Sequence, residues 1–310
     1  MTRKGIGDDL EFFRVVATST SLTGAARVLG ASLPSVSKRL RALESRLGVR
    51  LARRTTRRID LTPEGELLAQ EADHILRQID DLEERLVPPS ESLTGKLLVQ
   101  APHGFGRNHV APLVARFGRA HPKLEIQLDL TNEPVEGTRT RFDVGIMLGQ
   151  PPDSRLVARR VLANRRIVCA APEYLARMGE PRTPAELREH NCIILRANQD
   201  DYTTWRLHDG DTEHNVHVSG DLASSDGEVV TEWCLQGLGL ILRSEWNVRE
   251  YLRDNRLVRV LDGFGDQRAD VHVVFESAPT VPRRVFAFAD FIRAEMPKRF
   301  DADPTVSPGA

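Results

Sequence analysis

Residues 21–48, SLTGAARVLGASLPSVSKRLRALESRLG, decide the fold of the N-terminal part of this chain. Ser21 is a favourable N-cap for a short helix, and Gly30 follows where a left-handed residue commonly ends one. Ser32 then caps a second helix, in which apolar residues recur every three or four positions at Val36, Leu40, Leu43 and Leu47. The stretch therefore predicts two helices joined by a tight turn.

The outward face of the second helix is small and basic. It is formed by Ser35, Ser37, Lys38, Arg39, Arg41 and Ala42. Short side chains allow a helix to approach base edges in the major groove of DNA, where Lys and Arg reach phosphates or guanine. The alternative is an ordinary pair of surface helices with a solvated run of charge.

The charges downstream favour the DNA interpretation. From Lys38 to Arg58 the chain has nine Lys or Arg residues and one acidic residue, Glu44. Four of the basic residues fall in a predicted hairpin whose apolar positions are Ile59 and Leu61; they are Arg53, Arg54, Arg57 and Arg58. Such a wing would place cations in a minor groove or on flanking phosphates.

Residues 10–65, LEFFRVVATSTSLTGAARVLGASLPSVSKRLRALESRLGVRLARRTTRRIDLTPEG, resemble the DNA-binding signature of the LysR-type transcriptional regulators. The resemblance implies contacts with operator DNA from Pro34, Ser35, Ser37, Lys38 and Arg54. With their neighbours on the helix and the wing, these residues form the predicted DNA-binding set: Ser32, Leu33, Pro34, Ser35, Ser37, Lys38, Arg39, Arg41, Arg53, Arg54 and Arg57.

Three positions depart from the residues common in that family. Leu33 stands in place of glutamine, Lys38 in place of arginine, and Ala52 in place of a phenylalanine in the wing. Leucine can touch a thymine methyl group, but it cannot make the bidentate contact with adenine that glutamine makes. The sequence therefore leaves the operator open.

A long helix is predicted at residues 63–87, with Pro63 at its first position, where the missing N–H costs nothing. Its apolar residues step by four and three, as in a heptad repeat: Leu68, Ala72, Ile75, Ile79, Leu82 and Leu86. About 25 residues at about 1.5 Å each make a rod longer than one small domain requires. We expect this helix to join two copies in a homodimer, with a tetramer as the larger assembly; the alternative is packing on its own domain.

The charge of the chain is divided unevenly. Residues 1–62 hold 13 basic and 5 acidic residues, a balance of +8, so residues 63–310 carry −9 to give the net charge of −1. Only the N-terminal region is suited to a polyanion such as double-stranded DNA. The 310 residues, 40% of them hydrophobic, include no apolar segment typical of a signal peptide or a membrane span. This predicts a cytoplasmic protein without a membrane partner.

The three cysteines, Cys169, Cys192 and Cys234, are widely spaced and form no CxxC pair. They are predicted to be reduced thiols in the core of a cytoplasmic protein. A redox switch is the alternative.

Residues 88–96 contain prolines, serines and a glycine, and they predict a hinge. Beyond it, strand-like and helix-like segments alternate, which indicates an α/β domain with a parallel sheet and, from residue 165, a second unit of the same kind. The expected strands lie at 97–101, 124–130, 142–148, 192–196, 203–208, 214–218, 239–242 and 271–275, and the expected helices at 109–120, 226–237 and 281–296.

Three stretches here resemble the effector domain of LysR-type regulators, in a branch that includes regulators of tartrate and malate use. They are APHGFGRNHVAP (101–112), NRRIVCAAPEYLARMGEPRTPAELREHNC (164–192) and GLGLILRSEW (237–246). The resemblance implies two lobes similar to a periplasmic binding protein. The predicted fold is therefore α+β multidomain: a winged helix-turn-helix at 1–62, the linker helix at 63–87, the hinge at 88–96, effector lobe I at 97–162 and 274–300, effector lobe II at 163–273, and a disordered tail at 301–310.

In open α/β sheets, ligands bind beyond the carboxyl ends of strands and near helix N-termini. PHGFG, residues 102–106, follows a strand and opens a helix, although it matches no phosphate-binding motif. If the fold is as implied, further stretches converge with it, and the predicted effector-binding set is His103, Gly104, Phe105, Met147, Gly149, Arg196, Trp205, Ser224, Ser225 and Asp226.

For several of these residues the alternative is an ordinary structural role without ligand contact. His103 could be an ordinary loop histidine, and Met147 and Trp205 could be core residues. Met147 and Ser225 also stand where the branch often carries arginine and asparagine, which would suit an effector that is less anionic or larger than a dicarboxylate.

The sequence thus predicts a DNA-binding transcriptional regulator controlled by a small-molecule effector, such as an organic acid. An enzyme is disfavoured because no GxSxG, HExxH, phosphate loop or cluster of histidines and carboxylates occurs. A solute-binding protein would explain residues 97–300, but not the basic N-terminal region. No cofactor and no metal is expected.

Overall fold

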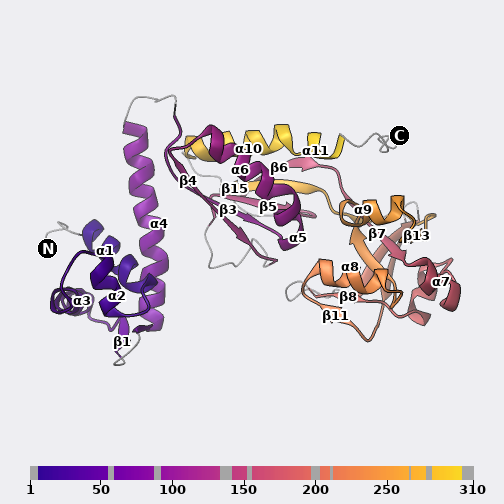
Figure 1. Cartoon of the computed structure of the whole chain (residues 1–310), viewed down its shortest axis with the longest axis horizontal. Coiled ribbons are helices and arrows are strands. Elements are labelled where there is room, and N and C mark those ends of the chain that lie inside the picture. Colours follow the sequence, from indigo (N-terminus) through magenta and orange to yellow (C-terminus); the bar gives the residue numbers. More distant parts are fainter. Residues whose placement is uncertain are drawn as a thin grey trace. The chain divides into compact units, whose positions relative to one another are not determined.

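The computed structural model describes residues 6–54, 59–86, 92–132, 142–151, 156–196, 203–209, 212–264, 267–276 and 281–301 (Figure 1). Residues 88–91 of the predicted hinge and residues 302–310 of the predicted tail lie outside these ranges. The chain divides into two compact units, residues 1–91 and 92–310. Each unit is described by itself.

The first unit is a winged helix-turn-helix, as predicted. Helices α1 (Ile6–Thr18), α2 (Leu22–Val28) and α3 (Leu33–Leu47) precede an antiparallel hairpin of β1 (Ala52–Arg54) and β2 (Ile59–Leu61), and α4 (Pro63–Leu86) follows. In the hairpin, Ala52 lies opposite Leu61 and Arg54 opposite Ile59.

Local sequence sets the ends of the two central helices. The Ser21 hydroxyl accepts the N–H of Gly24 at 3.1 Å, and the Ser32 hydroxyl accepts the N–H of Ser35 at 3.4 Å. Gly48 ends α3 with a φ of 75°, a conformation that favours glycine. Of the expected buried face of α3, Val36, Leu40 and Leu43 join the core, but Leu47, the last residue of the helix, is exposed and lies outside that core.

Helix α4 divides its apolar residues between two faces. Leu68, Ala72 and Leu76 pack against Leu10 of α1, so the alternative of packing on its own domain holds for this part of the helix. The prediction that all the heptad residues contact a second copy is therefore wrong for Leu68 and Ala72. Three of its remaining residues are exposed despite being large and apolar: Ile75 (37%), Ile79 (38%) and Leu82 (49%).

Lobe I of the second unit has a five-stranded sheet of order β4-β3-β5-β15-β6. The strands are β3 (Gly95–Ala101), β4 (Leu124–Leu130), β5 (Val144–Leu148), β6 (Leu156–Leu162) and β15 (Val271–Glu276). Strand β3 is parallel to β4 and β5, as expected, whereas β15 runs antiparallel to both β5 and β6. Because β15 begins at Val271, the chain has returned to lobe I before the expected boundary at residue 273.

Helices cover this sheet. The first begins after β3 as α5 (His103–Phe105), continues as a π-helical turn at Gly106–Val110, and becomes α6 (Ala111–Ala120). Helix α10 (Arg283–Glu295) packs on β6 and β15, and α11 (Lys298–Asp301) follows it (Figure 1).

Lobe II contains a sheet in which β7 (Arg165–Ala170) lies between β12 (Ile241–Ser244) and β13 (Val258–Val260). Strand β14 (Gln267–Arg268) also pairs with β7, and all three partners are antiparallel to it. The expectation of a second parallel sheet is therefore wrong for β7 and its partners. Alternation of strand and helix implies parallel neighbours only when consecutive strands pair, and here the partners of β7 come from more than 70 residues later in the chain.

Two smaller pairs complete lobe II. Strands β9 (Thr204–Asp209) and β10 (Thr212–His217) form an antiparallel hairpin, and β8 (Ile194–Leu195) is parallel to β11 (Ala223–Ser224). The helices are α7 (Pro172–Met178), the 3-10 helix Pro184–Glu189, α8 (Gly227–Leu235) and α9 (Glu245–Arg253). None of the helices in the described ranges combines the length and apolarity that a bilayer crossing requires.

Candidate functional site

The outward surface of α3 presents most of the predicted DNA-binding residues. Ser32, Leu33, Pro34, Ser35, Lys38 and Arg41 are exposed, and Ser37 is half-buried. Pro34, Lys38 and Arg41 follow one another at intervals of four and three, so they share one face of the helix. The Arg41 Nε donates to the Ser37 carbonyl at 3.3 Å, which lays this guanidinium along the helix surface.

Arg39 departs from the expectation of an outward DNA-binding side chain. Its guanidinium donates to the Asp8 carbonyl at 2.7 Å, lies 3.5 Å from the Asp9 carboxylate, and stacks over the Phe12 ring at 4.6 Å. These contacts turn Arg39 toward α1. It therefore fixes the position of α3 instead of extending toward a groove.

Glu44 is a functional residue that the sequence reasoning missed. It is only 7% exposed, and its Oε1 accepts the N–H groups of Leu51 at 2.9 Å and Ala52 at 3.3 Å. The carboxylate thereby holds the start of β1, the first strand of the wing. The available signal was its position as the one acidic residue among nine basic ones.

We expect Glu44→Ala to lower the free energy of unfolding by about 2–3 kcal/mol, because two buried N–H groups lose their acceptor. Glu44→Gln keeps an oxygen at that place and should cost less than about 1 kcal/mol. Thermal unfolding of both variants measures the difference. Equal melting temperatures for the alanine variant and the wild type would contradict this role.

The wing is described only in part. Arg53 is exposed on β1, opposite Asp60 of β2. The side chain of Arg54, and the whole of Arg57, lie outside the described residues, so their assignment to DNA stays a prediction.

The second candidate site lies where lobe I meets lobe II. Asn132, just after β4, accepts the N–H of His103 at 3.3 Å through Oδ1 and donates from Nδ2 to the Ser225 carbonyl at 3.0 Å. One side chain thus links the start of α5 in lobe I to the start of α8 in lobe II. Asn132 could not be predicted from the sequence, because it is 93 residues away from Ser225.

Gly104 lies beside the same junction. A Cβ placed on it would be 3.0 Å from the Glu228 Oε1 and 3.6 Å from the Trp246 ring, both of lobe II. The absence of a side chain at Gly104 therefore permits this close approach of the lobes.

The predicted residues at the start of α8 form a turn. The Ser224 hydroxyl accepts the N–H of Asp226 at 3.1 Å, and the Asp226 carboxylate accepts the N–H of Glu228 at 2.7 Å as the N-cap. Arg196 is next to them, because its N–H donates to the Ser224 carbonyl at 2.7 Å. The structure thus brings together His103, Gly104, Arg196, Ser224, Ser225 and Asp226.

The other predicted effector residues lie elsewhere. Phe105 is fully buried in the core of lobe I, stacked on Phe300 at 6.4 Å, and Trp205 is buried in the core of lobe II. Both belong to packed interiors and are removed from the candidate site. Met147 is half-buried at the end of β5 opposite His272, and Gly149 donates its N–H to the Asp270 carbonyl at 2.9 Å, beside the crossover between lobes.

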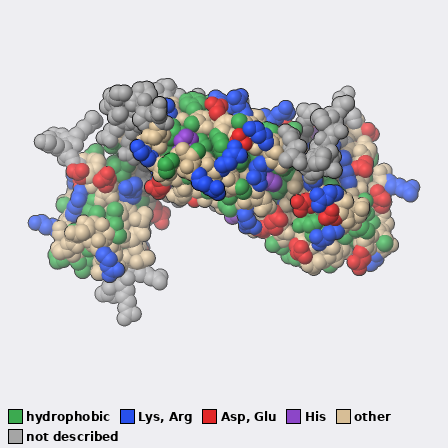
Figure 2. Space-filling view, turned by 45° about the horizontal axis from the view of Figure 1, so that its top comes forward, with side chains coloured by type: hydrophobic (Ala, Val, Ile, Leu, Met, Phe, Trp, Pro, Cys, Tyr) green, Lys and Arg blue, Asp and Glu red, His purple; other side chains and the backbone are tan. Residues whose placement is uncertain are grey.

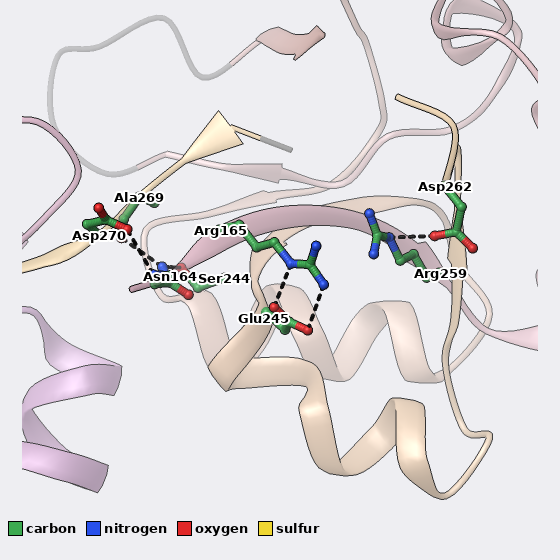
Figure 3. A network of polar contacts seen from close by, with 8 residues as sticks. All are labelled: Asn164, Arg165, Ser244, Glu245, Arg259, Asp262, Ala269 and Asp270. Atoms are coloured by element: carbon green, nitrogen blue, oxygen red, sulfur yellow. Dashed lines mark hydrogen bonds and ion pairs between the residues drawn. The ribbon is translucent and has the colours of Figure 1, made fainter. Parts of the chain in front are cut away.

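Figure 3 shows the polar contacts at this crossover. Asn164 lies between β6 and β7, and its Nδ2 donates to the Ala269 carbonyl at 2.8 Å and the Ser244 hydroxyl at 3.2 Å. Its N–H donates to the Asp270 carboxylate at 3.0 Å. Both strands that cross between the lobes are therefore tied together by one buried amide.

The bidentate pair of Arg165 with Glu245, at 2.7 and 3.2 Å, holds α9 to the same crossover (Figure 3). Burial alone would raise the pKa of Glu245, but the hydrogen bond and charge of Arg165 outweigh it and hold that pKa below its usual value. The carboxylate is therefore ionised at neutral pH, and the pair stays charged.

An aromatic cluster also joins the two lobes. His109 of the π-helical turn packs on Phe300 at 4.7 Å, on Phe105 at 5.0 Å and on Trp246 of α9 at 5.2 Å. Burial, together with the charges of Arg299 and Arg249, lowers the pKa of His109 to about 4. The imidazole is therefore neutral at pH 7.

Because the folded state disfavours the imidazolium, we expect the stability from His109 to be complete above about pH 6.5 and lost as the pH falls toward 4. Solvent screening of the partly exposed ring leaves about 1–2 kcal/mol of this dependence. His109→Phe keeps the aromatic packing without the charge. Its melting temperature should exceed that of the wild type at pH 5 and match it at pH 8; the same difference at both pH values would contradict this.

On the face shown in Figure 2, the effector domain carries basic (blue) and acidic (red) side chains that are interspersed. No group of three or more His, Cys, Asp or Glu side chains suited to a metal ion occurs in the residues that the structure describes.

Cys169, Cys192 and Cys234 are buried and form no disulfide, and burial raises the pKa of Cys192 to about 12.

Two family models match this chain. The bacterial regulatory helix-turn-helix proteins of the lysR family match residues 8–66, and the LysR substrate binding domain matches residues 90–297. The chain belongs to the LysR family. It is a LysR-type transcriptional regulator with a DNA-binding domain and an effector-binding domain, and the resemblance seen in the sequence is confirmed. Its relatives are named as regulators of transcription and not as enzymes.

Similar proteins span nearly the same length. The chain is 34% identical over 286 residues to the HTH-type transcriptional regulator DmlR of Escherichia coli K12, covering 92% of this chain and 93% of that protein. It is 32% identical over 270 residues to the activator TtdR of the same strain, covering 87% of each.

Solved structures of other LysR-type regulators have the same architecture. The full-length virulence activator AphB of Vibrio cholerae matches with a TM-score of 0.62 and 26% identity, over 93% of this chain and 99% of that one. CrgA of Neisseria meningitidis matches with a TM-score of 0.58 and 29% identity, over 93% and 98%.

Proposed function

We propose that this LysR-type regulator binds operator DNA as a homodimer, in which each copy places α3 in a major groove and its wing beside the flanking backbone. The charge of the α3 surface carries this proposal. Lys38 and Arg41 are exposed on one face, whereas Glu44, the one acidic residue nearby, is buried and occupied by the wing backbone. The surface offered to DNA is therefore cationic.

Homodimerisation is proposed through the second half of α4. Ile75, Ile79 and Leu82 are spaced by four and three, and all three remain exposed after the first half of the helix has packed on α1. A second copy of the helix would bury them and set two recognition helices at the spacing of two operator half-sites. We propose a tetramer, formed through further contacts, as the larger assembly. Because the proposed partner is operator DNA, we also propose that the protein is cytoplasmic.

The effector is proposed to bind between the lobes, against His103 and Gly104 on one side and residues 224–226 on the other. Asn132 already links these two edges, so a molecule that lies between them acts on the contact that sets the lobe arrangement. A preference of a few kcal/mol for one arrangement is enough to shift the population. We propose an organic acid as the effector class, because residues 101–112, 164–192 and 237–246 resemble regulators of tartrate and malate use.

Mobility shift with the DNA upstream of the protein's own gene tests the operator function. Because phosphate contacts release counterions, affinity should fall by about a thousandfold between 50 and 200 mM salt. A fragment from inside an unrelated coding region is the control. Equal affinity for the two fragments at every salt concentration would contradict the proposal.

A further inference from the structure

Arg243 of β12 is a buried cation that the residues around it leave incompletely bonded. Its side chain is only 8% exposed, and its Nε donates to the Asn247 Oδ1 at 3.0 Å. The two terminal nitrogens, Nη1 and Nη2, have no acceptor in the part of the chain that the structure describes. Neither nitrogen is completely buried, so both keep some access to solvent.

The two free nitrogens lie against the N-terminus of α8. A Cβ on Gly227, the first residue of this nine-residue helix, would overlap both of them. The Asp226 carboxylate caps the N–H of Glu228, while the N–H groups of Gly227 and Val229 have no acceptor among the described residues. A guanidinium and the positive end of a helix dipole thus meet at one point.

The neighbouring carboxylates do not neutralise this arrangement directly. The pKa of Arg243 is lowered to about 10, mainly because burial disfavours the charged form; the negative charges of Glu228 and Asp226 oppose this change, and the positive charge of Arg166 reinforces it. Neither carboxylate forms an ion pair with the guanidinium in the described structure. Arg243 is therefore charged at neutral pH and has two donors available for an anion.

A short chain of hydrogen bonds within lobe II runs from Arg243 to Glu228, whose carboxylate lies beside Gly104 of lobe I. Asn247 accepts from Arg243 and from the Thr231 hydroxyl at 2.8 Å, and its Nδ2 donates to the Glu228 Oε1 at 2.8 Å. That same oxygen is the one that faces Gly104. The guanidinium therefore belongs to the wall of lobe II that meets lobe I.

We propose that Arg243 and the first turn of α8 bind a carboxylate group of the effector. The parallel donors Nη1 and Nη2 match the two oxygens of one carboxylate, and the free N–H groups of α8 supply further donors. This inference rests on the proposed effector site and identifies the chemical group that the site recognises. The negative charges of Glu228 and Asp226 lie close to this carboxylate group, so both residues weaken its binding.

The test compares carboxylates with their uncharged amides: acetate with acetamide, benzoate with benzamide, and succinate with succinamide. Binding to the full-length protein is measured by thermal shift and calorimetry at constant ionic strength. We expect wild-type protein to bind at least one carboxylate and to bind its amide at least about tenfold more weakly. Arg243→Gln should weaken the carboxylate by about tenfold to a hundredfold and leave the amide unchanged.

Glu228→Gln is a second variant with the opposite expectation. It keeps an oxygen for Asn247 and removes one negative charge, so the same carboxylate should bind several times more tightly. Arg243→Lys keeps the charge without the planar pair of donors and should fall between glutamine and wild type. Circular dichroism shows that each variant is folded before its affinity is compared.

The assignment would be overturned if no carboxylate bound wild-type protein, or if one bound with equal affinity to the Arg243→Gln and Glu228→Gln variants. Equal binding of an amide and its acid would also overturn it, while leaving an effector site between the lobes intact. Loss of operator binding in the mobility shift is a separate result that concerns the proposed function only.

Discussion

Ser37→Glu should abolish specific operator binding, with a loss of affinity of more than about a hundredfold. Ser37 lies in the N-terminal half of α3, between the exposed Pro34 and Arg41, where recognition helices contact base edges. A carboxylate there would face the phosphates and the acceptor atoms of the bases, so repulsion would replace a neutral contact. Mobility shift with the protein's own upstream DNA measures the loss.

Ser45→Glu is the matched control, because it makes the same change on the same helix. Ser45 is exposed two turns later, near the C-terminal end of α3, away from the end that enters a groove. Its affinity should stay within a few-fold of wild type, and both variants should keep the wild-type melting temperature. If the two glutamates weakened binding equally, the docking of α3 through its N-terminal half would be wrong.

Ile79→Asp should convert the protein into monomers and reduce operator affinity by more than about a hundredfold. Ile79 is the middle residue of the exposed apolar stripe on α4, between Ile75 and Leu82. Dimer formation would bury the new carboxylate between two helices, and removing this charge from water costs a large free energy, so the dimer should dissociate. A monomer binds one half-site and loses the gain from the linked second contact. Light scattering gives the mass, and mobility shift gives the affinity.

Gln70→Asp is the control for charge on α4. Gln70 is exposed, and it lies about 140° from Ile75 and about 180° from Ile79 around the helix. This variant should remain dimeric and bind the operator as wild type does. A dimeric Ile79→Asp protein with unchanged affinity would exclude α4 as the dimer contact.

The residues whose roles the sequence predicted correctly are those that interact with residues nearby in the sequence. Ser21 and Ser32 cap helices, Gly48 takes the left-handed conformation that ends α3, and Val36, Leu40 and Leu43 repeat at helical spacing and are buried. Each of these follows from interactions within one turn of the chain. For the same reason the winged helix-turn-helix and the family could be predicted before any tertiary contact was known.

In the effector domain, the sequence predicted which segments meet at the junction between the lobes, but not which side chains lie there. His103, Gly104 and Ser224–Asp226 meet at the junction, whereas Phe105 and Trp205 turn into separate cores. Successive side chains of a helix or strand point in different directions. A residue next to one at the junction can therefore be buried in a core, and the sequence alone does not predict which of the two is buried.

Only the tertiary structure decided the contacts between distant residues. Arg39 turns from the DNA face to Asp9, Glu44 turns inward to the wing, and Leu68 and Ala72 pack on α1 instead of a second copy. Asn132 reaches Ser225, and Arg243 lies under Gly227 with two free donors. The sequence by itself determined helix ends, helix faces and the division of charge, because these depend on local spacing; the direction of each charged side chain depends on burial and on partners that the fold brings from elsewhere in the chain.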